Sequence, residues 1–156
     1  MDLTTMRVGS VLPAVRLEDP RGNIVDLKEQ LNGPVCIALT AGWCTYCAVE
    51  MEALAQLGVQ YPDAVKIIII NLDRDLDDFN ADRKKSPAKE LLWYHAVAEQ
   101  ELREQLRVRS LPVVYLLNDS VLARAPAPMP SNGLGALFHQ AKMQQQQDKR
   151  IKVWDD

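Results

Sequence analysis

Two almost wholly apolar segments with a helical segment between them constrain the fold more than any other feature of the sequence. They are VCIALT, residues 35–40, and VKIIIINL, residues 65–72. Short apolar runs of this kind are typical of strands buried on both faces. Residues 44–59 predict a helix, with Gly58 as its C-terminal stop. A helix that joins two strands makes a crossover connection, so we expect these strands to lie parallel in one sheet.

Further elements are expected on both sides of this unit. Residues 10–27 carry apolar stretches around the turn signal DPRGN at 19–23, which indicates a β-hairpin or a pair of short edge strands. Residues 111–117 predict another apolar strand, and the tight turn at 118–120 leads into an antiparallel return strand. Residues 134–145 predict a final helix.

The middle of the chain is polar and its pattern is weaker. Residues 73–86 show a weak helical pattern around Leu76 and Phe79, and Pro87 interrupts it. Residues 88–108 are rich in Ala, Leu and Glu and predict one helix or two short ones. The sequence therefore predicts an α/β fold: a central mixed β-sheet flanked by helices, with an N-terminal β-hairpin and an insertion in the middle of the chain.

Length and composition fit one globular domain over residues 1–156, with a core at about 8–142 and a polar C-terminal tail at 143–156. The 156 residues are 47% hydrophobic and carry a net charge of −3. No cluster of basic residues alternates with aromatic ones, so we expect no nucleic-acid partner. No apolar run approaches the roughly 18 residues of a transmembrane helix, so we expect no such segment in this chain.

The cysteines number three, and two of them are spaced as Cys-x-x-Cys. Cys36, Cys44 and Cys47 are too few for a disulfide scaffold or for a four-thiolate zinc site, and His95 and His139 lie far from them in the sequence. The count favours one reactive pair and one spare thiol. Cys36 falls within an apolar strand, where a cysteine usually acts as a small hydrophobic residue.

The expected helix gives the two paired cysteines different chemistry. Cys44 falls at its start, where free backbone N–H groups and the helix dipole stabilise a thiolate and lower the thiol pKa. Cys47 lies one turn further on, where it can attack a mixed disulfide formed by Cys44. The spacing thus supplies a nucleophile and a resolving thiol. An inert pair and a metal site are the two other interpretations of the same spacing.

Glu50 falls within the apolar arc of this helix, one turn after Cys47. Burial there would raise the pKa of its carboxyl group, which could then exchange a proton with Cys47. The other interpretation is a carboxylate that reaches solvent or pairs with a base from another element. An aromatic residue before Cys-x-x-Cys at a strand-to-helix junction favours a partly exposed wall of the site for Trp43, and a plain core residue is the other interpretation.

These residues resemble the thioredoxin superfamily. GWCTYC, residues 42–47, matches its Trp-Cys-x-x-Cys signature after a buried strand, and VRSLPVVYLLN, residues 108–118, resembles the segment that holds the family's cis-proline, here Pro112. The resemblance implies a thioredoxin-like fold. It also implies that the backbone of Leu111 pairs with the substrate chain, and that Trp43 and this loop form the docking surface.

Residues 8–54 resemble more closely the TlpA-like branch of thiol–disulfide oxidoreductases, whose members often carry a glutamate at the position of Glu50. The resemblance implies an enzyme that exchanges disulfides with protein cysteines and favours the reductase direction over the oxidase direction. It implies no cofactor and no metal. Its electrons would come from an upstream thiol reductase or a membrane electron donor. The family resemblance places the protein in the periplasm or cell envelope, and a natural start at Met1 would place it in the cytoplasm.

The sequence departs from the family pattern at two places, and two other functions are alternatives to thiol–disulfide exchange. A leucine precedes Pro112, where threonine or valine is commoner, and residues 73–108 are longer than in a minimal thioredoxin. A thiol peroxidase would need Thr-x-x-Cys and a nearby arginine, but Thr40 lies four residues before Cys44. A copper-handling or adaptor protein on this fold would use a wider cysteine spacing and a downstream histidine such as His139.

Overall fold

The computed structural model describes residues 6–124, 126–128 and 131–147, which form one mixed sheet and the helices around it. The strand order is β2-β1-β5-β4-β3-β6-β7, and β8 pairs with β6 off this path. The strands are β1 (Arg16–Glu18), β2 (Ile24–Asp26), β3 (Pro34–Thr40), β4 (Lys66–Asn71), β5 (Leu92–Ala96), β6 (Val113–Asn118), β7 (Val121–Leu122) and β8 (Ala127–Pro128). The helices are η1 (Leu27–Gln30, a 3₁₀ helix), α1 (Thr45–Gln60), α2 (Leu76–Lys85), α3 (Glu99–Gln105) and α4 (Ser131–Gln147).

The pairing of the central strands agrees with the sequence. β3 is parallel to β4, as expected for strands joined by the crossover helix α1. β6 lies antiparallel to β3 on its other side and continues antiparallel into β7 through the turn at Asp119 and Ser120, both of which have positive φ. The N-terminal hairpin is present as antiparallel β1 and β2. The prediction of a central mixed sheet is therefore confirmed.

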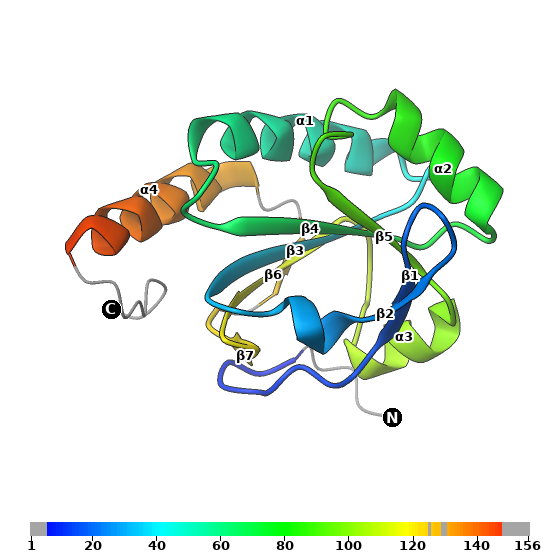
Figure 1. Ribbon diagram of the computed structural model, residues 1–156, viewed down its shortest axis with the longest axis horizontal. Coiled ribbons are helices and arrows are strands. Elements are labelled where there is room, and N and C mark those ends of the chain that lie inside the picture. Colours follow the sequence, from blue (N-terminus) through cyan, green and yellow to red (C-terminus); the bar gives the residue numbers. More distant parts are fainter. Residues whose placement is uncertain (1–5, 125, 129–130, 148–156) are drawn as a thin grey trace.

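Helices cover both faces of the sheet (Figure 1). α1, α2 and α4 lie over one face, and η1, α3 and the segment that precedes β1 lie over the other. β4 shows why its sequence is continuously apolar. Ile67 and Ile69 join the apolar cluster under α1, whereas Ile68 and Ile70 join the cluster on the opposite face.

The prediction that residues 88–108 are wholly helical is wrong. Residues 92–96, LWYHA, form β5, which pairs in parallel with β4 and antiparallel with β1, and only α3 of this region is an α-helix. Trp93 and Tyr94 are both buried, and they pack on opposite faces of the sheet. Pairing with two neighbouring strands outweighs the helix preference of the alanine, leucine and glutamate residues around them.

Two predicted boundaries also need correction. Gly58 does not end the helix, because α1 continues to Gln60. A Cβ atom on Gly58 would lie 2.7 Å from Leu91 Cδ2, so its role is the close approach of α1 to the segment before β5. The last helix, α4, extends beyond 134–145 at both ends, so residues 143–147 of the expected tail are helical. Residues 148–156 lie outside the described residues.

Within the described part of the chain, no helix combines the length and the apolar character that crossing a membrane requires.

Candidate functional site

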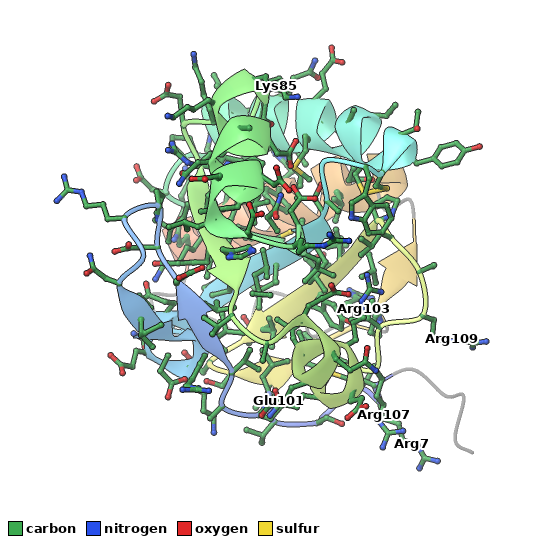
Figure 2. All side chains as sticks on the ribbon, turned by 90° about the vertical axis from the view of Figure 1, so that its right-hand side faces the viewer. Arg7, Lys85, Glu101, Arg103, Arg107 and Arg109 are labelled. Atoms are coloured by element: carbon green, nitrogen blue, oxygen red, sulfur yellow. A yellow bond between two sulfur atoms is a disulfide. The ribbon has the colours of Figure 1, made fainter. Side chains whose placement is uncertain are left out.

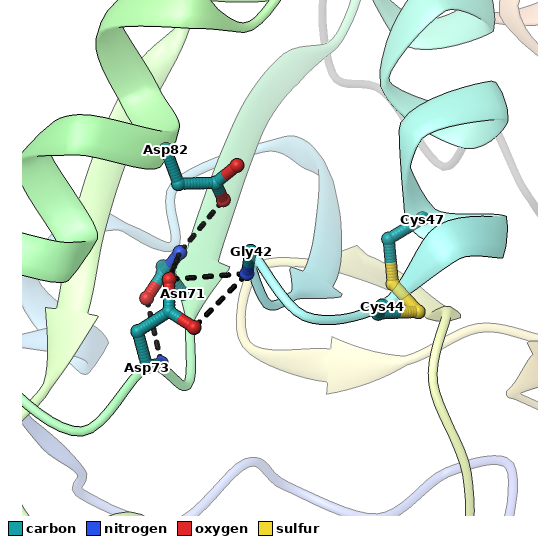
Figure 3. Close-up of a disulfide and its surroundings, with 6 residues drawn as sticks. All are labelled: Gly42, Cys44, Cys47, Asn71, Asp73 and Asp82. Atoms are coloured by element: carbon teal, nitrogen blue, oxygen red, sulfur yellow. Dashed lines mark hydrogen bonds between the residues drawn. A yellow bond between two sulfur atoms is a disulfide. The ribbon is translucent and has the colours of Figure 1, made fainter.

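The site lies in the segment that connects the end of β3 to the first turn of α1. Cys44 is the N-cap residue of α1, with extended backbone angles, and its N–H donates a 3.1 Å hydrogen bond to the carbonyl of Ala41. Cys44 and Cys47 form a disulfide (Figure 3). Cys44 is half-buried, whereas only 1% of Cys47 is exposed. The structure therefore brings the predicted pair together, and Cys44 is the more exposed of the two residues.

The surface beside the disulfide is apolar although it faces solvent. Trp43 and Tyr46 are 65% and 66% exposed, and Val49 is exposed one turn further along α1. Exposed aromatic and aliphatic side chains that lie together on a protein surface are typical of a contact surface for another molecule. We name Trp43, Tyr46 and Val49 the rim.

The Leu111–Pro112 peptide bond is cis, as the family resemblance implied. Its place follows from strand register. Val113 of β6 pairs with Leu39 of β3, so Pro112 stands opposite Thr40, at the edge of the sheet from which the chain enters α1. Pro112 is buried and Leu111 is half-buried. The predicted docking loop and the cysteine pair thus lie at the same edge of the sheet.

Glu50 is buried, as its position in the apolar arc predicted, with 1% of its surface exposed. It lies one turn after Cys47 on the face of α1 that covers the sheet. Its charge also reaches Cys36 in β3. Burial raises the pKa of the Cys36 thiol, and the negative charge of Glu50 raises it further. Cys36 is fully buried and is the only free cysteine among the described residues, which agrees with the structural role predicted for it.

A polar network on the other side of Cys44 was missed by the sequence analysis (Figure 3). Both carboxylate oxygens of Asp73 accept the N–H of Gly42, each at 3.0 Å. The side-chain amide of Asn71 donates to Asp73 at 3.0 Å and to Asp82 of α2 at 2.9 Å, and its oxygen accepts the N–H of Asp73 at 2.7 Å. The loop that enters α1 is therefore fixed by the end of β4, and through Asn71 it is connected to α2.

The charges and hydrogen bonds of this network shift the pKa of Asp82. Burial raises the pKa of this carboxyl group, and the charge of Asp73 raises it further, whereas the hydrogen bond from Asn71 and the charge of Lys85 act in the opposite direction. Gly42 takes part for a steric reason, since a Cβ atom there would lie 3.0 Å from Asp73 Oδ2. The available sequence signal was the pair of polar residues Asn71 and Asp73 at the carboxyl end of a parallel strand, the end at which ligands and functional groups gather in α/β sheets.

The two histidines lie apart from the disulfide chemistry. His95 is buried, contacts Glu18 Oε1 at 2.6 Å and the carbonyl oxygen of Asp73 at 2.7 Å, and stacks on Phe79. His139 of α4 lies against Tyr61, the C-cap residue at the opposite end of α1 from Cys44. No group of three or more metal-ligating side chains occurs among the residues that the structure describes.

Comparison with known proteins identifies the family. The thioredoxin-like family matches residues 32–121, which is more than half of the chain and includes both cysteines, Glu50 and Pro112. The chain belongs to this family. The prediction that the chain is a member of the thioredoxin superfamily is therefore confirmed. None of the curated proteins matches the chain.

Solved structures share the fold at low sequence identity. A thiol:disulfide interchange protein from Bacteroides sp. has a TM-score of 0.75 at 19% identity, covering 89% of this chain and 95% of that one. The thioredoxin domain of a thiol-disulfide oxidoreductase from Bacteroides vulgatus has a TM-score of 0.71 at 18% identity, covering 85% of this chain and 99% of that one. Both comparisons support the thioredoxin-like architecture.

Proposed function

We propose that the protein is a thiol–disulfide oxidoreductase that acts on protein cysteines, with the reduction of substrate disulfides as its direction. The observation that carries this proposal is the asymmetry of the disulfide: Cys44 is half-buried at the N-cap of a helix of 16 residues, and Cys47 is enclosed one turn further on. In the reduced protein, the helix dipole and the free N–H groups of the first turn favour a thiolate at Cys44.

The exchange takes two steps. The Cys44 thiolate attacks one sulfur of a substrate disulfide, and the other substrate sulfur leaves as a thiolate that takes up a proton. Cys47 then loses its proton and attacks Cys44 Sγ, which forms the disulfide seen here and releases the second substrate thiol. Two electrons move from the cysteine pair to the substrate, and a separate thiol reductase or membrane electron donor must return them.

Glu50 is proposed as the proton acceptor for Cys47 in the second step. Its burial disfavours the charged carboxylate and makes the uptake of a proton favourable. The rim, with the Leu111–Pro112 loop, is proposed as the docking surface. Trp43 presents an exposed aromatic face beside Cys44, and the backbone of Leu111 supplies hydrogen-bonding groups for an extended substrate segment.

Trapping of the mixed disulfide tests this proposal. Cys47→Ser removes the resolving thiol, so the reduced variant should form a stable covalent complex with a disulfide-containing protein such as oxidised insulin, at Cys44. Cys44→Ser should form none, and Cys36→Ser, which alters a buried thiol in β3, should behave like the wild-type protein. A complex that forms through Cys47 or Cys36, or no complex at all, would contradict the proposed roles.

A further inference from the structure

A pocket of about 200 Å³ opens directly beside the proposed nucleophile. One wall comes from the end of β3 and the start of α1, and the other comes from α2 and the residues that follow it. Its polar lining includes Thr40, Gly42, Cys44, Asp82, Lys85 and Ser86. Lys85 is the last residue of α2 and lies at the outer end of that helix (Figure 2). The rim and the Leu111–Pro112 loop do not line this pocket. The pocket is therefore a second surface next to Cys44, separate from the proposed docking surface.

The pocket carries charges of both signs. Asp82 is half-buried, and burial raises the pKa of its carboxyl group. The charge of Asp73 raises this pKa further, whereas the hydrogen bond from Asn71 and the charge of Lys85 lower it. A cation in the pocket would offset both the burial and the repulsion. Lys85 is exposed at the mouth, and together with the N-terminal end of α1 it favours an anion there. The walls are therefore suited to a ligand that bears an ammonium and a carboxylate.

The size of the pocket restricts the ligand further. Its volume of about 200 Å³ lies below the roughly 300–1,000 Å³ of sites that enclose drug-sized molecules. A folded substrate segment does not fit, but a group of the size of one amino acid does. Since Cys44 lines the same pocket, the sulfur of such a group would lie at the reacting atom.

We propose that this pocket binds one half of a low-molecular-weight amino-acid disulfide, with its ammonium at Asp82, its carboxylate at Lys85 and its sulfur at Cys44. Cystine is the simplest molecule of this class. The proposal rests on the thiol–disulfide exchange proposed above and adds a small-molecule substrate to it.

The chemistry balances without a further reactant. The Cys44 thiolate attacks one sulfur of cystine, the cystine S–S bond breaks, and one cysteine leaves as a thiolate that is protonated. The other half stays in the pocket as a mixed disulfide until Cys47, losing its proton, attacks Cys44 Sγ and releases it. Two protons and two electrons pass from the protein dithiol to two cysteine molecules. The reverse sequence allows free cysteine to reduce the oxidised protein.

Four small disulfides with different charges test the proposal. Cystine carries ammonium and carboxylate groups, cystamine only ammonium, 3,3′-dithiodipropionate only carboxylate, and hydroxyethyl disulfide neither. The oxidation rate of the reduced protein by each is divided by its rate with free dithiothreitol, which removes differences in intrinsic reactivity. For the wild-type protein, this relative rate should be highest for cystine and lowest for hydroxyethyl disulfide.

Two variants separate the charges of the pocket. Lys85→Gln should lower the relative rates for cystine and dithiodipropionate about two- to five-fold against hydroxyethyl disulfide, as expected for an exposed ion pair. Asp82→Asn should lower those for cystine and cystamine about five- to tenfold, because its carboxylate is partly desolvated. Lys84→Gln, an exposed neighbour that does not line the pocket, should leave the order of the four disulfides unchanged.

The outcomes distinguish the pocket from the exchange itself. Equal effects of Lys85→Gln or Asp82→Asn on all four disulfides would overturn the pocket proposal, since they would report on Cys44 rather than on ligand charge. Oxidation by insulin with no preference for cystine over hydroxyethyl disulfide would overturn it as well and leave the proposed function standing. A reduced protein that neither insulin nor any small disulfide oxidises would contradict the proposed function.

Discussion

The N-terminal end of α1 is positioned by polar contacts, whereas its C-terminal end is held by apolar packing. At the first end, Asp73 binds the N–H of Gly42, and the residues that follow are left partly exposed. At the other end, Tyr61 contacts Phe138 of α4, and Gly58 allows close approach to Leu91. The first arrangement leaves Cys44 accessible and the second supplies stability. Substitutions at the two ends should therefore affect different measurements.

The largest expected effect is the loss of exchange in Cys44→Ser. The hydroxyl cannot form the mixed disulfide, so reduction of insulin by dithiothreitol should fall to the rate without protein. Cys44 is half-buried at the helix cap, and serine is a favoured N-cap residue, so α1 should remain intact by circular dichroism. Residual exchange well above background would show that another group acts as the nucleophile.

Phe138→Ala should give the opposite result at the other end of the helix. Its fully buried ring contacts Tyr61, and its removal should lower the free energy of unfolding by about 3–5 kcal/mol, measured by urea denaturation. Exchange at temperatures where the variant is folded should be unchanged. Met143→Ala, at an exposed position of the same helix, should change the unfolding free energy by less than about 0.5 kcal/mol. A slowed exchange in folded Phe138→Ala would remove the distinction between the two ends.

Glu50→Gln tests the buried carboxyl group that lies between the two ends of α1. The amide keeps the shape of the side chain but cannot accept the Cys47 proton, so the resolving step should slow about 10²-fold. The measurement is the decay of a preformed mixed disulfide as a function of pH. Glu52→Gln, at an exposed position on the same helix, should decay like the wild-type protein. An unchanged rate and pH profile in Glu50→Gln would assign Glu50 a purely structural role.

The smallest expected effect is a change in the pH dependence of stability in Asp82→Asn. Since folding raises the pKa of Asp82 above 3.8, the folded state binds this proton more tightly than the unfolded state does. Stability contributed by Asp82 is thus present at low pH and is lost as the pH rises through the raised pKa. Asp82→Asn should remove this loss. The unfolding free energy of the variant minus that of the wild type should therefore increase as the pH rises above 3.8.

Urea denaturation at several pH values measures this difference. Asp63→Asn, at an exposed position, serves as the control for the loss of one carboxylate. If Asp82→Asn instead became less stable relative to the wild type as the pH rose, the carboxylate would be a stabilising charge, and the repulsion between Asp73 and Asp82 would not hold.

The sequence predicted the parts of the fold and site that depend on local pattern. The apolar runs that became β3 and β4, the turn at Asp119 and Ser120, and the Cys44–Cys47 pair at a helix start all have short-range signals. The buried position of Glu50 followed from helical periodicity alone. The cis bond before Pro112 followed from family resemblance, since no local pattern specifies it.

What could not be predicted depends on contacts between distant segments. β5 is a strand because β1 and β4 pair with it, although its neighbours favour helix. Asp73 and Asp82 come together at Asn71 only when α2 packs beside the end of β4. The pocket at Cys44 likewise requires α2 to lie beside the segment that runs from the end of β3 into α1. The local sequence predicted that Gly58 ends the helix. In the structure, the lack of a Cβ atom at this position makes room for the side chain of Leu91.

The central claim is that Cys44 and Cys47 form a reversible redox pair that works as a reductant. Its most direct test is the equilibrium reduction potential of the pair, measured against glutathione and dithiothreitol, with Cys47→Ser as the control that cannot form the couple. A two-electron couple at about −270 mV or lower is predicted, as for thioredoxin. A value between about −180 and −120 mV would contradict the reductase direction, and the absence of a reversible couple would contradict the redox function itself.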